Sequence, residues 1–76
     1  MTAIMRLAAK AWELREAARE ALCAGDRPAY ALDLARVACR LHATPQGQRL
    51  LALALLAAGQ MAEALKLIER PPEPLR

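Results

Sequence analysis

The chain has 76 residues, a formal net charge of +3, and a hydrophobic fraction of 57%. This length allows one small domain, and the mild charge, with acids and bases interleaved, argues against a strongly basic nucleic-acid-binding protein. The sequence has no serine, no asparagine and a single histidine, His42. Nucleophilic and acid–base catalysis need several convergent groups of these kinds. We therefore expect a protein that is not an enzyme, with no catalytic residues and no cofactor.

The composition favours an all-α fold. The 19 alanines and 14 leucines make up 33 of the 76 residues, and both residue types lose little by entering a helix. Apolar residues spaced by three and four, together with the proline and glycine positions, predict four helices at about residues 2–24, 27–43, 45–58 and 61–69. The helices form a single domain over residues 1–70, and Pro71, Pro72 and Pro74 predict an extended tail over residues 71–76.

A turn that contains glycine separates the first two predicted helices. Thr2 is expected to cap the first helix and Gly25 to end it. The first helix carries one continuous apolar stripe, formed by Ile4, Leu7, Ala11, Leu14, Ala18 and Ala21. Asp26 is expected to cap the second helix, and Pro28 to lie in its first turn. The expected buried side of the second helix consists of Tyr30, Leu34, Val37, Ala38 and Leu41.

The last two predicted helices form a hairpin hinged at Gly59. Thr44 is expected to cap the third helix, with Pro45 at its first position. Residues 50–58 are nine apolar residues in a row, so this helix must be covered on more than one side. The fourth helix is amphipathic, and its apolar face is formed by Met61, Ala64, Leu65 and Ile68.

The sequence contains an internal repeat. Gly25 and Gly59 are 34 residues apart, and each one follows an alanine- and leucine-rich helix and precedes another helix. The second copy places Leu51, Ala52, Leu55, Gly59 and Ala64 in the turn-region pattern of a 34-residue helical repeat. This copy resembles the tetratricopeptide repeat (TPR), and the resemblance covers roughly residues 11–70.

The first copy of the repeat is looser. Tyr30 stands where the tetratricopeptide pattern has a small residue, and Ala31 follows one position late. This offset indicates either a one-residue insertion around Pro28 or a tilt of the second helix. The resemblance implies two degenerate TPR-like repeats, that is, two antiparallel helical hairpins. The alternative is an alanine-rich four-helix bundle in which the two glycine positions agree by chance.

The resemblance also implies a binding surface. In tetratricopeptide arrays the first helices of the pairs line a concave groove that binds segments of other proteins. Here the candidate groove residues are Trp12, Arg15, Arg19, Arg49, Leu53 and Leu56. Three arginines beside apolar side chains would suit an acidic peptide or a chain-terminal carboxylate. Alternatively, Arg19 only pairs with Glu16, and Arg15 is solvated.

These features predict a protein–protein interaction module, namely a small accessory subunit, adaptor or chaperone of a larger assembly. The partner is another protein subunit, a peptide, or a second copy of the chain in a homo-oligomer, because two repeats leave apolar helix surface uncovered. Alternatives are a small nucleic-acid-associated regulator, which the acidic residues of the last helix disfavour, and a metal-binding bundle that uses Cys23, Cys39 and His42. The longest apolar run is too short to span a membrane, and we expect a cytoplasmic protein.

Overall fold

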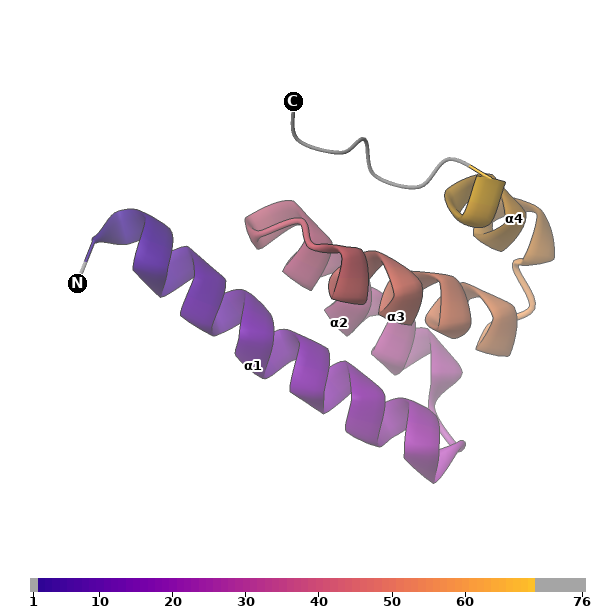
Figure 1. The fold of residues 1–76 in the computed structure, drawn as a ribbon. Coiled ribbons are helices and arrows are strands. Elements are labelled where there is room, and N and C mark those ends of the chain that lie inside the picture. Colours follow the sequence, from indigo (N-terminus) through magenta and orange to yellow (C-terminus); the bar gives the residue numbers. More distant parts are fainter. Residues whose placement is uncertain (1, 70–76) are drawn as a thin grey trace.

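The computed structural model describes residues 2–69, and this part of the chain consists of helices joined by short turns (Figure 1). The helices are α1 (Ala3–Ala24), α2 (Pro28–Leu41), α3 (Pro45–Ala57) and α4 (Met61–Glu69). The predicted all-α class is confirmed, and the predicted helix bounds agree to within one or two residues. The proline-rich tail predicted for residues 71–76 lies outside the described residues.

Threonine side chains cap two of the helices, as predicted. Thr2 Oγ1 accepts a hydrogen bond of 3.2 Å from the backbone N–H of Met5 at the start of α1. Thr44 Oγ1 accepts one of 2.9 Å from the N–H of Gly47 at the start of α3, where Pro45 is the first helical residue. Each bond satisfies one of the amide groups that lack a partner inside the helix.

The turn between α1 and α2 differs from the prediction at one residue. Gly25 ends α1 in the left-handed region, with φ of +77°, and its N–H donates to the carbonyl of Ala21. Pro28 begins α2 as expected, but the prediction that Asp26 caps this helix is wrong. The residue before Pro28 is Arg27, and no side chain bonds to the first turn. Asp26 lies one residue too early in the turn to reach the free amides.

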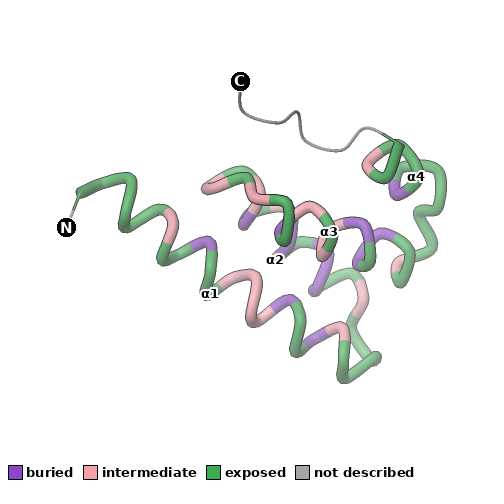
Figure 2. The backbone as a smooth tube through the Cα atoms, in the orientation of Figure 1, coloured by how far each residue is buried: buried purple, intermediate pink, exposed green. Residues whose placement is uncertain are grey.

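Alanines form most of the core. Consecutive helices pack on one another in chain order, and α1 also contacts α3. Figure 2 shows the buried residues on the sides of the helices that face each other. The central cluster consists of Ala18, Leu32, Ala35, Ala54, Leu55 and Ala64. Leu55 is the largest fully buried side chain in the described part of the chain, so the core is thin and the helix backbones approach closely.

The buried side of α2 differs from the predicted one. Ala31, Leu32, Ala35 and Ala38 face the core, whereas Tyr30 and Val37 are exposed and Leu34 and Leu41 are half-buried. The helix packs against both α1 and α3, and close approach on two sides selects its alanine face over its bulkier one. Tyr30 instead lies at the surface under the guanidinium of Arg27, with Cζ 4.9 Å from the ring centre.

The segments that follow the two turn glycines are offset by one residue. The buried alanine of α2, Ala31, lies six residues after Gly25, whereas that of α4, Ala64, lies five residues after Gly59. Helix α2 likewise begins three residues after its glycine, and α4 begins two residues after its own. This is the offset for which the sequence indicated either a one-residue insertion around Pro28 or a tilt of the second helix, and both remain predictions.

The first turns of α1 extend beyond the rest of the fold. Helix α1 has 22 residues and α2 has 14, so α2 leaves the N-terminal end of α1 without a neighbour (Figure 1). Ile4 and Leu7, which belong to the apolar stripe predicted for the first helix, are therefore exposed, Ile4 at 72%. The first buried residue of α1 is Ala11. Within residues 2–69, each helix is too short or too polar to cross a membrane.

Candidate partner-binding groove

An apolar groove lies between α3 and α4. Its volume is about 580 Å³, and α3 forms most of its wall. We call it the apolar groove, and its lining residues are Pro45, Gln48, Arg49, Ala52, Leu53, Leu56, Leu67 and Ile68. The predicted groove residues Arg49, Leu53 and Leu56 are among them, whereas the contribution of α4 was not predicted.

The large side chains of the apolar groove remain open to solvent. Leu53 is 57% exposed and Ile68 is 58% exposed, and Leu56 is also exposed. Leu55, on the same helix, is fully buried. The nine-residue apolar run was predicted to be covered on more than one side, and α3 does contact α1, α2 and α4, but Leu53 and Leu56 stay exposed. Met61 and Leu65, from the predicted apolar face of α4, are exposed as well.

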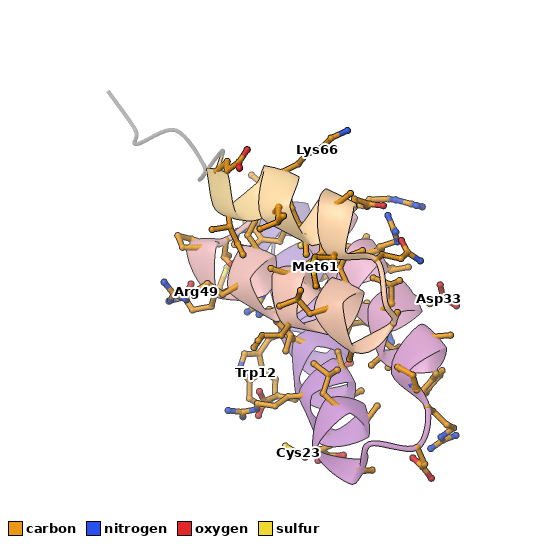
Figure 3. The ribbon with its side chains drawn as sticks, turned by 90° about the vertical axis from the view of Figure 1, so that its right-hand side faces the viewer. Trp12, Cys23, Asp33, Arg49, Met61 and Lys66 are labelled. Carbon is orange, nitrogen blue, oxygen red and sulfur yellow. The ribbon has the colours of Figure 1, made fainter. Side chains whose placement is uncertain are left out.

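A second, more polar pocket adjoins the apolar groove. Its volume is about 220 Å³, and it shares Arg49 and Leu53 with the apolar groove. We call it the cationic pocket, and its lining residues are Arg15, Glu16, Arg19, Gln46, Arg49, Leu50 and Leu53. The three predicted arginines, which come from α1 and α3, therefore line one pocket. Trp12 lines neither pocket, but it is exposed on the same side of the molecule as Arg49, opposite Asp33 (Figure 3).

Arg19 is paired within its own helix. Its Nη2 donates to both carboxylate oxygens of Glu16, and the distance to Oε2 is 2.7 Å. This pairing is the alternative that the sequence left open for Arg19. Exposed ion pairs of this kind contribute only about 0–1 kcal/mol, so an arriving carboxylate can compete for the guanidinium.

Arg15 is half-buried between three helices, so the alternative of a fully solvated Arg15 does not hold. A Cβ placed on Gly47 of α3 would come within 3.4 Å of Arg15 Cδ and 3.6 Å of Cys39 Sγ, so this glycine leaves the space in which the arginine stem lies. Arg15 Nη1 is buried and has no hydrogen-bond partner within residues 2–69. Burial raises the pKa of the Cys39 thiol above its usual value, and the positive charge of Arg15 opposes part of this rise.

An ion pair links α2 to α4. Arg36 Nη1 lies 3.0 Å from Glu63 Oε2, and Arg36 Nη2 also lies 3.4 Å from Gln60 Oε1. Apart from this contact, α4 packs against α3 alone. The sequence gave no sign of this pair, because Glu63 is 27 residues away from Arg36 and becomes its neighbour only through the fold.

The residues of the metal-binding alternative do not form a cluster. Within residues 2–69, no three side chains of histidine, cysteine, aspartate or glutamate come close enough together to hold a metal ion. Cys23 is exposed on the last turn of α1, and Cys39 is half-buried on α2. Both thiols are free.

Comparisons of the chain with protein-family models, with curated proteins and with solved structures found no match. The tetratricopeptide resemblance therefore stays a prediction that depends on the repeat spacing and on the residues around Gly59. The assignment of a function depends on the geometry and chemistry of the apolar groove and the cationic pocket.

Proposed function

We propose that this chain is a non-enzymatic protein–protein interaction module that docks on another protein through the apolar groove. It would act as a small accessory subunit, adaptor or chaperone of a larger assembly. One observation carries the proposal: Leu53, Leu56 and Ile68 line a groove and are exposed, while alanines fill the core. Contiguous exposed apolar side chains that line a concavity are typical of protein interaction sites.

The proposal includes an architecture of two antiparallel, TPR-like hairpins, α1–α2 and α3–α4. The 34-residue spacing of the two turn glycines supports it. The contact between α1 and α3 supports it too, because the first helices of adjacent pairs are neighbours in such arrays. Within the described residues, Leu53, Leu56 and Ile68 of the α3–α4 hairpin stay exposed, so this apolar side is available to a partner.

The apolar groove can supply a modest part of a binding free energy. Complete burial of a leucine or isoleucine side chain is worth about 1.5–3 kcal/mol. Leu53, Leu56 and Ile68 are each roughly half exposed, so covering all three would contribute about 2–5 kcal/mol. A micromolar complex needs about 8 kcal/mol, and the arginines of the cationic pocket are the nearest source of the remainder.

The polar groups of the apolar groove support a binding role over a catalytic one. Gln48 and Arg49 are the polar side chains in its lining. Neither is a nucleophile or a general base at neutral pH. Both can donate hydrogen bonds to a partner, so they suit recognition.

Site-specific photo-crosslinking tests the proposal in the cells from which the chain comes. Benzoylphenylalanine at Leu53 should give a discrete adduct with a different protein, and the same probe at Val37 should not. Val37 is a suitable control because it is also exposed but lies on α2, which lines neither pocket. An adduct of twice the mass of the chain would assign the groove to a homo-oligomer. The absence of any adduct at Leu53 would refute the proposed function.

A further inference from the structure

We infer that the occupant of the apolar groove is an amphipathic α-helix of another protein, carrying acidic side chains at the end that lies over the cationic pocket. This inference deepens the proposed function and rests on it. Three features of the described residues carry it. They are the chemistry of the groove lining, the length of the groove along α3, and the distribution of charge around it.

The groove lining favours a helix over an extended peptide. An extended segment buried against Leu53, Leu56 and Ile68 would need partners for its backbone N–H and C=O groups. The groove offers it few partners, namely the side chains of Gln48 and Arg49 and the last-turn carbonyls of Leu67 and Ile68, because the backbone groups along the middle of α3 are used within that helix. A helix satisfies its own backbone groups and can present a purely apolar face.

The dimensions of the groove suit about three helical turns. Its α3 wall runs from Pro45 to Leu56, which corresponds to about 17 Å at 1.5 Å per residue. Arg49 and Ala52 lie between these ends at helical spacing, so the wall is one stripe along α3. A partner helix that runs along this stripe would need apolar residues at positions i, i+3 or i+4, and i+7.

The charges beside the groove select an acidic partner. Arg49 belongs to both the apolar groove and the cationic pocket, and Arg15 and Arg19 lie beyond it. The acidic residue in these two linings is Glu16, which is already paired with Arg19. Arg49 is exposed and has no ion pair within the described residues, so a carboxylate beside it would gain a charge-assisted hydrogen bond.

The same charges argue against the N-terminal end of α1 in a second copy of this chain as the occupant. This end of α1 is one exposed apolar segment that a second copy could insert, with Ile4 and Leu7. Its charged residues up to the start of the core are Arg6 and Lys10, which would meet Arg49 of the groove. Like charges that meet at an interface weaken binding. Acidic side chains at the same place would instead pair with Arg49 and strengthen it.

Selection from a random peptide library tests the inference. The full chain is immobilised, 16-residue peptides are selected by display, and their dissociation constants are measured by fluorescence anisotropy. We expect the enriched peptides to carry apolar residues at i, i+3 or i+4, and i+7, with aspartate or glutamate near one end. Arg49→Glu should weaken their binding at least tenfold, whereas Arg6→Glu, an equal charge change on an exposed residue of α1, should change it less than twofold. A proline in the middle of the peptide should abolish binding.

Three results would overturn the inference. The first is enrichment of peptides without acidic residues, and the second is binding that tolerates the central proline. The third is an equal response to Arg49→Glu and Arg6→Glu, which would mean that peptides bind away from the groove. In each case the proposed function stands if Leu53 still crosslinks to another protein. It fails together with the inference only if no crosslinked protein is found.

Discussion

Two identical substitutions on α3 test the assignment of its buried and open sides. Leu55 is fully buried and Leu53, two residues away, is 57% exposed. Leu→Ala at a buried site costs about 2.7–5 kcal/mol, because apolar contacts are lost and a cavity remains. A domain of this size has a free energy of unfolding of about 4–11 kcal/mol, so Leu55→Ala should remove about a quarter of it or more. Leu53→Ala should cost less than about 1 kcal/mol, since both residues favour helix and no cavity forms.

Circular dichroism at 222 nm, followed during thermal and urea unfolding, measures both effects. At about 4–8 °C per kcal/mol, Leu55→Ala should lower the Tm by more than about 10 °C, and Leu53→Ala by no more than about 8 °C. Equal losses would refute the reasoning, because the side of α3 that faces the groove would then also be a core side. A loss at Leu53 that grows as the protein is concentrated would show that a second copy covers the groove.

Other parts of the fold lead to three further expectations. Gly59 has φ of +81°, and there is open space where a Cβ would lie. Gly59→Ala should therefore lower the free energy of unfolding by about 1–2 kcal/mol through backbone strain alone. Urea unfolding measures this loss, and an unchanged midpoint would contradict the prediction. A double-mutant cycle with Arg36→Ala and Glu63→Ala should give a coupling free energy of about 0.2–1 kcal/mol that decreases with added salt. Zero coupling at low salt would show that this ion pair does not stabilise the contact between α2 and α4. Cys23 should react with a thiol reagent faster than Cys39 at pH 7–8, because burial raises the pKa of Cys39 and lowers its thiolate fraction; equal native rates would contradict this. For the same reason, the stability linked to Cys39 is present below the pKa of the unfolded thiol and is lost as the pH rises through the higher folded pKa.

Local sequence signals predicted the helices well. Thr2, Thr44 and Pro45 mark helix starts, and Gly25 ends a helix, through interactions within a few residues of chain. These signals depend on backbone geometry that is set by neighbouring residues. Helix ends can therefore be predicted without knowledge of the tertiary structure. The cap assigned to Asp26 was wrong because it depends on the length of the turn.

Side-chain burial was harder to predict, because it depends on which helices lie opposite. The hydrophobicity of Tyr30 and Val37 predicted that these side chains are buried. Because α2 packs closely against two helices, its alanines are buried instead. Ile4 has the same helical spacing as the buried residues of α1, but α2 is too short to cover it.

The candidate site was predicted in part. The sequence grouped Arg15, Arg19 and Arg49 through the resemblance to a repeat, and these residues line one pocket. It missed Ile68 as a wall of the groove, because the position of α4 depends on its packing against α3 and on a long-range ion pair. The partial burial of Arg15 also could not be read from the sequence, since the space for its stem comes from Gly47 on a different helix.

The most direct test of the central claim compares two substitutions on α4. Ile68 lines the apolar groove and is 58% exposed, whereas Leu65 is 46% exposed and lies outside the lining. Ile68→Asn and Leu65→Asn are polar changes on one helix, so they should disturb folding to a similar extent. The measurement is the dissociation constant of the selected acidic peptide for each variant. The groove account predicts at least a tenfold loss of affinity for Ile68→Asn and less than a twofold change for Leu65→Asn, and equal affinities of the two variants would contradict it.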